Sequence, residues 1–126
     1  MVPLVGPSSI TLALMASGLE GQRFAFCGYL PRETAERASS ASGSSRTARA
    51  REHETEIFIE TPYRNDVLLA ALLEDCRDTT KLCVAADLTL PTERSSRRNP
   101  SRNGAAQAAP IGRRPAVFLL LADAER

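Results

Sequence analysis

Tryptophan is absent from the 126-residue chain, and His53 is its single histidine. A zinc site would have to combine scattered cysteines with carboxylates, so no metal centre is expected. The cysteines, Cys27, Cys76 and Cys83, are odd in number and form no CxxC pair, which argues against a disulfide framework and favours a reducing cytoplasm. The N-terminus lacks the basic region of a secretory signal, and no apolar run approaches the length of a membrane span.

Neither an acidic nor a basic excess marks the chain, because 16 Lys and Arg against 15 Asp and Glu leave a net charge of +1. The overall charge therefore indicates no particular partner. Hydrophobic residues make up 43% of the chain, which is ordinary for one globular domain. The charge is uneven, however: residues 94–114 contain several Arg and no acid, so this segment either contacts phosphate or is a solvated tail.

Apolar segments with strand and helix patterns alternate along the chain. Strands are predicted over residues 23–30, 55–60, 81–89 and 115–122. A helix is predicted after the turn Gly6-Pro7-Ser8-Ser9, with Ser8 or Ser9 as its N-cap and Gly18 as its left-handed end.

A second helix is predicted over residues 65–76, which are strongly amphipathic. Asn65 is a good N-cap, and the apolar positions form one stripe: Val67, Leu68, Leu72 and Leu73. The alternation of strands and helices predicts an α/β fold with a mixed sheet.

Two stretches, residues 38–50 and 94–114, are rich in Ser, Ala and Arg and lack apolar periodicity, so both are predicted to be irregular. One hypothesis is that both are frameshift products of a GC-rich gene, which translation of the other two reading frames tests. The rival hypothesis is an Arg-rich arm that docks on RNA, with binding that weakens steeply as salt rises.

Four motifs occur in order and at sensible spacings: "VGPSS", "CGYLP", "ETPYR" and "ADLTLPTE". Together they resemble the "PGPSA", "GFLP", "YESPHR" and "RELTKxxE" motifs of the tetrapyrrole methylase superfamily, the class III S-adenosylmethionine-dependent methyltransferases. Within it, the motifs are most similar to the branch that methylates ribose 2′-hydroxyls of small-subunit ribosomal RNA. The resemblance covers most of the chain outside the two irregular stretches.

The resemblance implies a two-domain protein whose cofactor lies in the cleft between two α/β domains. Residues 1–126 correspond to the C-terminal α/β/α domain, in incomplete form, and the Gly-rich N-terminal domain is missing. Met1 then stands at the hinge between the domains, as an internal or misplaced start.

S-adenosylmethionine is the cofactor that the resemblance implies, and the matching cofactor-binding residues are Gly6, Pro7, Ser8, Ser9, Glu60 and Leu88. From residues 6–9 alone, a helix cap is the simpler interpretation. Glu60 can equally form a structural salt bridge with Arg64.

Tyr63 and Arg64 follow a Pro turn and are predicted to bind substrate, because an Arg at a cleft can hold a carboxylate or a phosphate. Asp87 and Thr89 flank Leu88, although Asp87 can instead cap the next turn.

No catalytic residue is assigned. Cys27 is interpreted as a small buried thiol, because the one histidine is distant in sequence and lies in a charged run predicted to be exposed. A base for a ribose hydroxyl can belong to the missing domain.

The first functional hypothesis is a fragment of a methyltransferase that acts on an RNA ribose 2′-hydroxyl, and the alternative substrate is a tetrapyrrole of the precorrin or uroporphyrinogen type. The second hypothesis is a catalytically inert remnant or binding module. The isolated chain is expected to be inactive. RNA and a second copy of the chain are the partners considered, with no membrane association.

Overall fold

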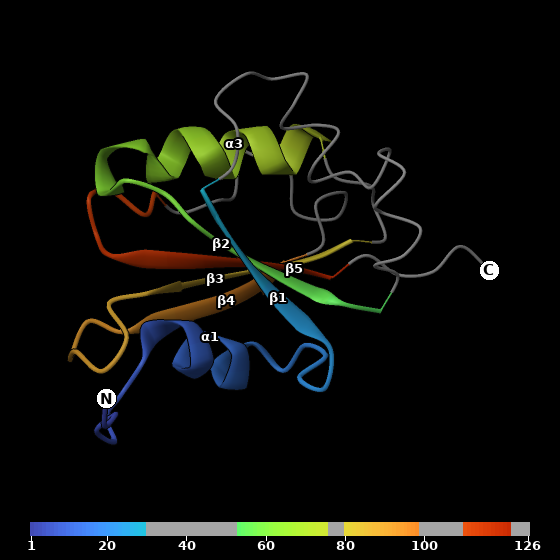
Figure 1. Ribbon diagram of the computed structural model, residues 1–126. Coiled ribbons are helices and arrows are strands. Elements are labelled where there is room, and N and C mark those ends of the chain that lie inside the picture. The colour runs from blue at the N-terminus through green and yellow to red at the C-terminus, as the bar shows by residue number, and fades with distance from the viewer. Residues whose placement is uncertain (30–52, 76–79, 99–109, 122–126) are drawn as a thin grey trace.

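The computed structural model describes residues 1–29, 53–75, 80–98 and 110–121. Within these ranges the elements are α1 (Ser9–Ser17), β1 (Phe24–Tyr29), β2 (Thr55–Ile59), the 3₁₀ turn η2 (Pro62–Arg64), α3 (Asn65–Asp75), β3 (Lys81–Ala86), β4 (Arg94–Arg98) and β5 (Ala116–Leu121). One sheet lies between α3 on one face and α1 on the other (Figure 1). The predicted α/β fold with a mixed sheet is confirmed, and so are the four predicted strands.

The five strands lie in the order β1-β2-β5-β3-β4. β1 and β2 are parallel, β5 is antiparallel to β2 and β3, and β4 is antiparallel to β3. β1, β2 and β3 therefore all end at one side of the sheet, where β4 and β5 begin. We call this side the carboxyl end of the sheet, and it is where open α/β sheets place their ligands.

The core has two layers because side chains alternate between the faces of a strand. Along the central strand β5, Phe118 and Leu120 pack on the α3 side, whereas Val117 and Leu119 pack on the α1 side. All four are buried, and each contributes about 1.5–3 kcal/mol by leaving water.

α1 begins and ends where the sequence predicts. Ser8 is the N-cap with an extended backbone, and Gly18 ends the helix at φ 64°. The Ser8 side chain, however, makes no capping hydrogen bond; only its carbonyl accepts, from Leu12 N–H at 2.9 Å and from the Thr11 hydroxyl at 3.2 Å. The first N–H groups of α1 thus have no side-chain cap and can bond an acceptor from outside the helix.

The prediction that residues 94–114 are irregular was wrong for the start of this segment, which forms strand β4. β4 pairs with β3 from Ala86↔Arg94 to Leu82↔Arg98. A Ser and Arg sequence gives no apolar alternation, whereas an edge strand needs only a backbone ladder on one side and is commonly charged. Residues 110–115 form a loop, while residues 38–50 and 99–109 lie outside the described residues.

The apolar stripe of α3 is partly different from the prediction. Leu68, Leu69 and Leu72 are buried against the sheet, whereas Val67 is 54% exposed. Leu73 is partly buried beside the same cluster. The buried face therefore follows the helical spacing of Leu68, Leu69 and Leu72, and the inclusion of Val67 was wrong.

Neither α1 nor α3, the helices of the described ranges, has the length and apolarity needed to cross a membrane.

Candidate functional site

A pocket of about 320 Å³ opens at the carboxyl end of the sheet. Four separate segments line it: Ser9 of α1, Ile59, Glu60 and Pro62 after β2, Ala85, Asp87, Leu88 and Leu90 around the end of β3, and Pro115, Ala116 and Val117 at the start of β5. Sites for small molecules range from about 300 to 1,000 Å³, so this pocket is at the small end. Three predicted cofactor residues, Ser9, Glu60 and Leu88, meet here.

The lining of this pocket combines apolar surface with a few polar groups. Leu88, Leu90 and Val117 supply apolar side chains, whereas Ser9 supplies a hydroxyl and Glu60 a carboxylate. Such a lining suits a ligand that has both an apolar part and hydrogen-bond donors. No group of three or more His, Cys, Asp or Glu that could hold a metal occurs in the part of the chain that the structure describes.

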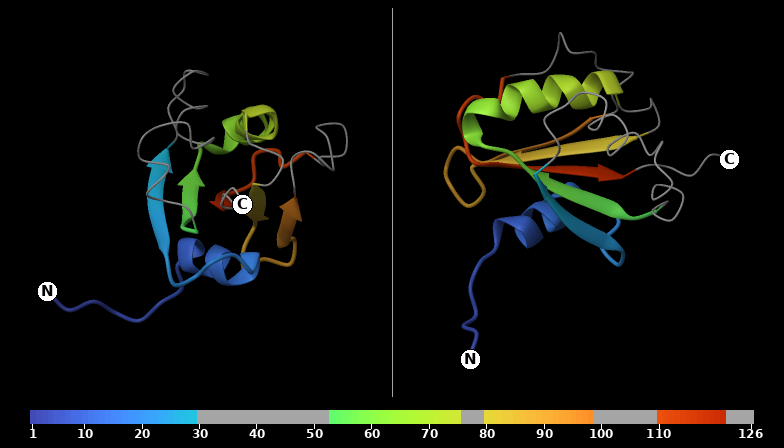
Figure 2. Two further views of the ribbon diagram at one scale, coloured as in Figure 1. Left: turned by 90° about the vertical axis from the view of Figure 1, so that its right-hand side faces the viewer. Right: turned by 45° about the horizontal axis from the view of Figure 1, so that its top comes forward.

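The segment before α1 brings only one of its predicted residues to the pocket. Ser9 lines it, whereas Gly6, Pro7 and Ser8 are exposed and do not. The chain before α1 extends away from the layers (Figure 2). A methyl group on Gly6 would meet nothing within 4 Å beyond its chain neighbours, so packing against the described residues does not require glycine there.

The Glu60 carboxylate is held by local partners. One oxygen accepts from the Thr61 N–H at 2.8 Å and from the Thr61 hydroxyl at 3.3 Å, and the other lies 4.0 Å from Arg64 Nε. The ion pair with Arg64 that the sequence allowed is therefore present at the limit of pairing distance. Glu60 forms this ion pair and also lines the pocket, so the two interpretations of the sequence do not exclude each other.

Tyr63 and Arg64, predicted to bind substrate, lie beside the pocket rather than in it. Tyr63 is 63% exposed. The Arg64 side chain is 22% exposed, and its buried Nε has no hydrogen-bond partner. A buried N–H without a hydrogen-bond partner costs about 1–3 kcal/mol of stability, so an acceptor that reaches Arg64 Nε would be bound favourably.

The turn between β3 and β4 holds Leu88 between two residues with an unusual backbone conformation. Asp87 and Thr89 on either side have φ of 52° and 71°, which cost about 1–3 kcal/mol each for residues with side chains. Asp87 accepts a hydrogen bond from the Thr92 hydroxyl at 2.9 Å, and Thr89 N–H donates to Glu93 Oε2 at 3.3 Å. Asp87 thus caps the turn, as one interpretation of the sequence proposed.

Two residues at the start of α3 hold the loop 110–115, and the sequence did not indicate this. Asn65 Nδ2 donates to the carbonyls of Gly112 at 3.3 Å and Arg114 at 2.7 Å. Asp66 accepts from the N–H groups of Ile111 at 2.7 Å and Gly112 at 3.1 Å. Asn65 is not the N-cap that was predicted, because its own backbone is helical and its side chain is buried against a loop 47 residues away.

His53 and Cys27, the two residues weighed in the sequence as a base and a nucleophile, lie away from this pocket. His53 is exposed, as predicted. Cys27 is partly buried against the α3-side core, and its Sγ lies 3.8 Å from the Ala25 carbonyl. Neither residue lines the pocket.

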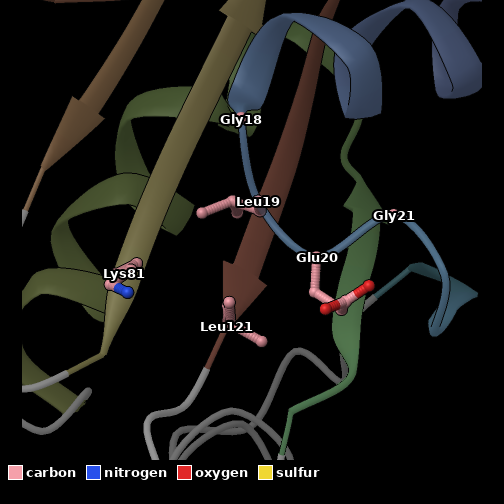
Figure 3. Close-up of a pocket in the computed structure, with 6 residues that line it drawn as sticks. All are labelled: Gly18, Leu19, Glu20, Gly21, Lys81 and Leu121. Atoms are coloured by element: carbon pink, nitrogen blue, oxygen red, sulfur yellow. The ribbon is translucent and has the colours of Figure 1, made fainter.

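A second depression, of about 330 Å³, lies at the opposite end of the sheet (Figure 3). Its lining consists of Gly18, Leu19, Glu20, Gly21, Lys81 and Leu121. The Glu20 carboxylate already accepts a hydrogen bond from Gln22 N–H at 2.7 Å. No residue predicted to bind cofactor or substrate belongs to this depression.

No protein-family profile matches the chain. The ribosomal RNA small subunit methyltransferase I of Mycobacterium bovis is 36% identical over a match that covers 63% of this chain and 29% of that protein. Proteins of the same name from Vibrio cholerae and Bacillus subtilis are 33% and 35% identical, with matches that cover 71% of this chain and 29% and 28% of the relative. The chain therefore spans less than a third of the length of these relatives.

Among solved structures, the crystal structure of the methyltransferase CobJ matches with a TM-score of 0.58 and 18% identity. The match covers 96% of this chain and 50% of CobJ. At this identity it establishes a shared fold. Sequence relatives that carry one name, together with this fold, show that the chain belongs to the tetrapyrrole methylase family.

Proposed function

We propose that the chain forms one wall of the S-adenosylmethionine site of a methyltransferase that acts on a ribose 2′-hydroxyl of ribosomal RNA. The observation that carries the proposal is the meeting of Ser9, Glu60 and Leu88 at one pocket. Each comes from a different one of the motifs that carry the family resemblance. The names of the sequence relatives support ribosomal RNA as the substrate.

The groups in the pocket suit different parts of this cofactor. The uncapped N–H groups at the start of α1 favour an acceptor such as the methionine carboxylate. Leu88 and Leu90 offer apolar contact to a purine ring, and carboxylates of the lining accept from hydroxyl or amino donors.

When bound, S-adenosylmethionine supplies an electrophilic sulfonium methyl, so the main task of the protein is to bind and align it. The two carboxylates of the lining, Glu60 and Asp87, are both engaged by neighbouring donors. We assign neither as a general base. The pocket is small, and we expect the remaining contacts to come from the part of the relatives that this chain does not span.

Two arginines at the carboxyl end of the sheet fit an RNA partner. Arg94 begins β4 and Arg113 lies in the loop before β5; both are exposed, and neither has an acidic partner among the described residues. Arg64 and Arg114, in contrast, face Glu60 and Asp87. Exposed arginines near a cofactor pocket can contact the phosphates of a nucleic-acid substrate.

Filter binding of a small-subunit ribosomal RNA fragment tests this surface. We expect the logarithm of the association constant to fall linearly with the logarithm of the salt concentration. The double variant R94Q/R113Q should bind more weakly, and the magnitude of this slope should be smaller by about 1–2. Equal affinity and equal salt dependence of the variant and the wild type would exclude these arginines from an RNA interface.

Calorimetry with S-adenosylmethionine tests the cofactor. Because one wall of the cleft is present, we expect binding weaker than micromolar and detectable only at millimolar concentration. Micromolar affinity would contradict the view that the isolated chain is inert, and no binding at millimolar concentration would overturn the proposal for this pocket.

A further inference from the structure

We propose that Asp87 is a positioning residue that fixes the separation of the two walls of the pocket, so that ligand affinity depends on its bonds to both of them. The proposal rests on the proposed function, because it takes this pocket as the cofactor site. Asp87 is 8% exposed and lies between the β3–β4 turn and the segment that enters β5.

The first wall is the β3–β4 turn, which carries Leu88 and Leu90 of the lining. The Asp87 carbonyl accepts from Leu90 N–H at 3.0 Å, and its Oδ2 accepts from the Thr92 hydroxyl at 2.9 Å. These bonds fold the turn back onto Asp87. Because Asp87 and Thr89 are in the left-handed region, the turn needs such bonds to keep its shape.

The second wall is the start of β5, which supplies Pro115, Ala116 and Val117. Asp87 N–H donates to the Pro115 carbonyl at 3.0 Å, and Oδ2 lies 3.7 Å from Arg114 Nε. The Asp87 side chain is 10% exposed and the Arg114 side chain 41%, so water screens this ion pair mainly from the Arg114 side. One residue therefore joins both walls through its backbone and its carboxylate.

Thr92 separates this role from direct ligand contact. Its hydroxyl bonds Asp87, yet Thr92 does not line the pocket. Removal of the Thr92 hydroxyl can therefore change the affinity for a pocket ligand only through its effect on Asp87. Thr92 is also exposed, so its replacement removes little packing.

The test compares Thr92→Val, which keeps the shape and removes the hydroxyl, with Thr92→Ser, which restores the hydroxyl. The probe is S-adenosylmethionine at millimolar concentration, followed by amide chemical shifts. We expect affinity about tenfold weaker in T92V, equivalent to about 1.4 kcal/mol, near-wild-type affinity in T92S, and similar thermal unfolding of all three proteins. Wild-type affinity in T92V, or equal weakening in T92S, would overturn the proposal.

Amide hydrogen exchange provides a readout that needs no ligand. We expect the Leu90 N–H, which donates to Asp87, to exchange faster in T92V and in D87N than in the wild type. If the wild type does not bind S-adenosylmethionine, the proposed function fails, while faster exchange still supports the positioning role. Unchanged exchange in both variants would overturn that role whatever the ligand does.

Discussion

At the scale of single residues, the wall of the pocket at β5 depends on two polar side chains far from it in sequence. Asn65 and Asp66 bond backbone groups of the loop 110–115, which leads into Pro115 and Ala116 of the pocket lining. Asn65 is fully buried and its Oδ1 has no hydrogen-bond partner. Its amide nitrogen therefore carries the whole interaction with the loop.

Replacing Asn65 should destabilise the protein in an order set by hydrogen-bond chemistry. N65A leaves two carbonyls without their donor, and we expect a loss of about 1–3 kcal/mol in the free energy of unfolding. N65D should cost more, because an ionised carboxylate cannot donate and would face the Gly112 and Arg114 carbonyl oxygens. Urea unfolding measures both, and an N65D variant as stable as the wild type would contradict the assigned contacts.

Gly6 allows a test of the proposed cofactor loop that is free of folding effects. A methyl group at Gly6 or at Gly21 would meet nothing within 4 Å, so G6A and G21A should both change the free energy of unfolding by less than about 0.5 kcal/mol. Gly6 does not line the pocket, so weaker S-adenosylmethionine binding by G6A alone would mean that the ligand extends to the segment before α1, as the family resemblance implies. If G6A binds the cofactor as G21A does, Gly6 has no part in the site.

At the scale of elements, the sequence predicted strands and helices where an apolar pattern exists. β5 is recognisable because Val117–Leu120 are apolar and buried on both faces, as a central strand requires. β4 was missed because its place in the sheet depends on a backbone ladder to β3, which leaves no apolar pattern in the sequence. The face of α3 was only partly predicted, because Val67 and Leu69 are equally apolar and tertiary packing decides between them.

A matched pair of substitutions on α3 tests its buried face. Leu72 is 1% exposed and packs in the α3-side core, so L72A should cost about 2–5 kcal/mol of unfolding free energy. Val67, on the same helix and 54% exposed, should lose less than about 1 kcal/mol in V67A. Chemical denaturation distinguishes them, and equal losses would mean that α3 packs through another face.

β1 is expected to promote self-association. Among the described strands it lies at the edge of the sheet, its residues Phe24–Tyr29 carry no charge, and Phe24 and Phe26 are 45% and 48% exposed. Uncharged, aromatic strand edges lack the usual protection against pairing with another chain. The variant F24T/F26T keeps strand propensity and should lower the weight-average mass in sedimentation at high concentration. An unchanged mass would show that this strand does not drive association.

At the scale of the whole molecule, the fold brings residues of three of the predicted motifs together at one pocket. Ser9, Glu60 and Leu88 meet because β2 and β3 end, and α1 begins, at the same end of the sheet. Gly6, Pro7 and Ser8 share the motif of Ser9 but lie outside the pocket, since a sequence motif does not specify which of its residues face a cavity. The turn cap made by Asp87 was one of the predicted alternatives, because its partner Thr92 is close in sequence. The role of Asn65 could not be assigned from sequence, because its partners in the loop 110–115 are set by long-range packing.

The central claim is that the pocket at the carboxyl end of the sheet binds S-adenosylmethionine. The most direct measurement is a map of backbone amide chemical shifts of the chain as S-adenosylmethionine is added to millimolar concentration. The account predicts that the amides of Ser9, Glu60 and Leu88 shift together with one affinity, while those of Lys81 and Leu121 at the opposite end do not. Shifts confined to that opposite end, or no shifts at all, would contradict it.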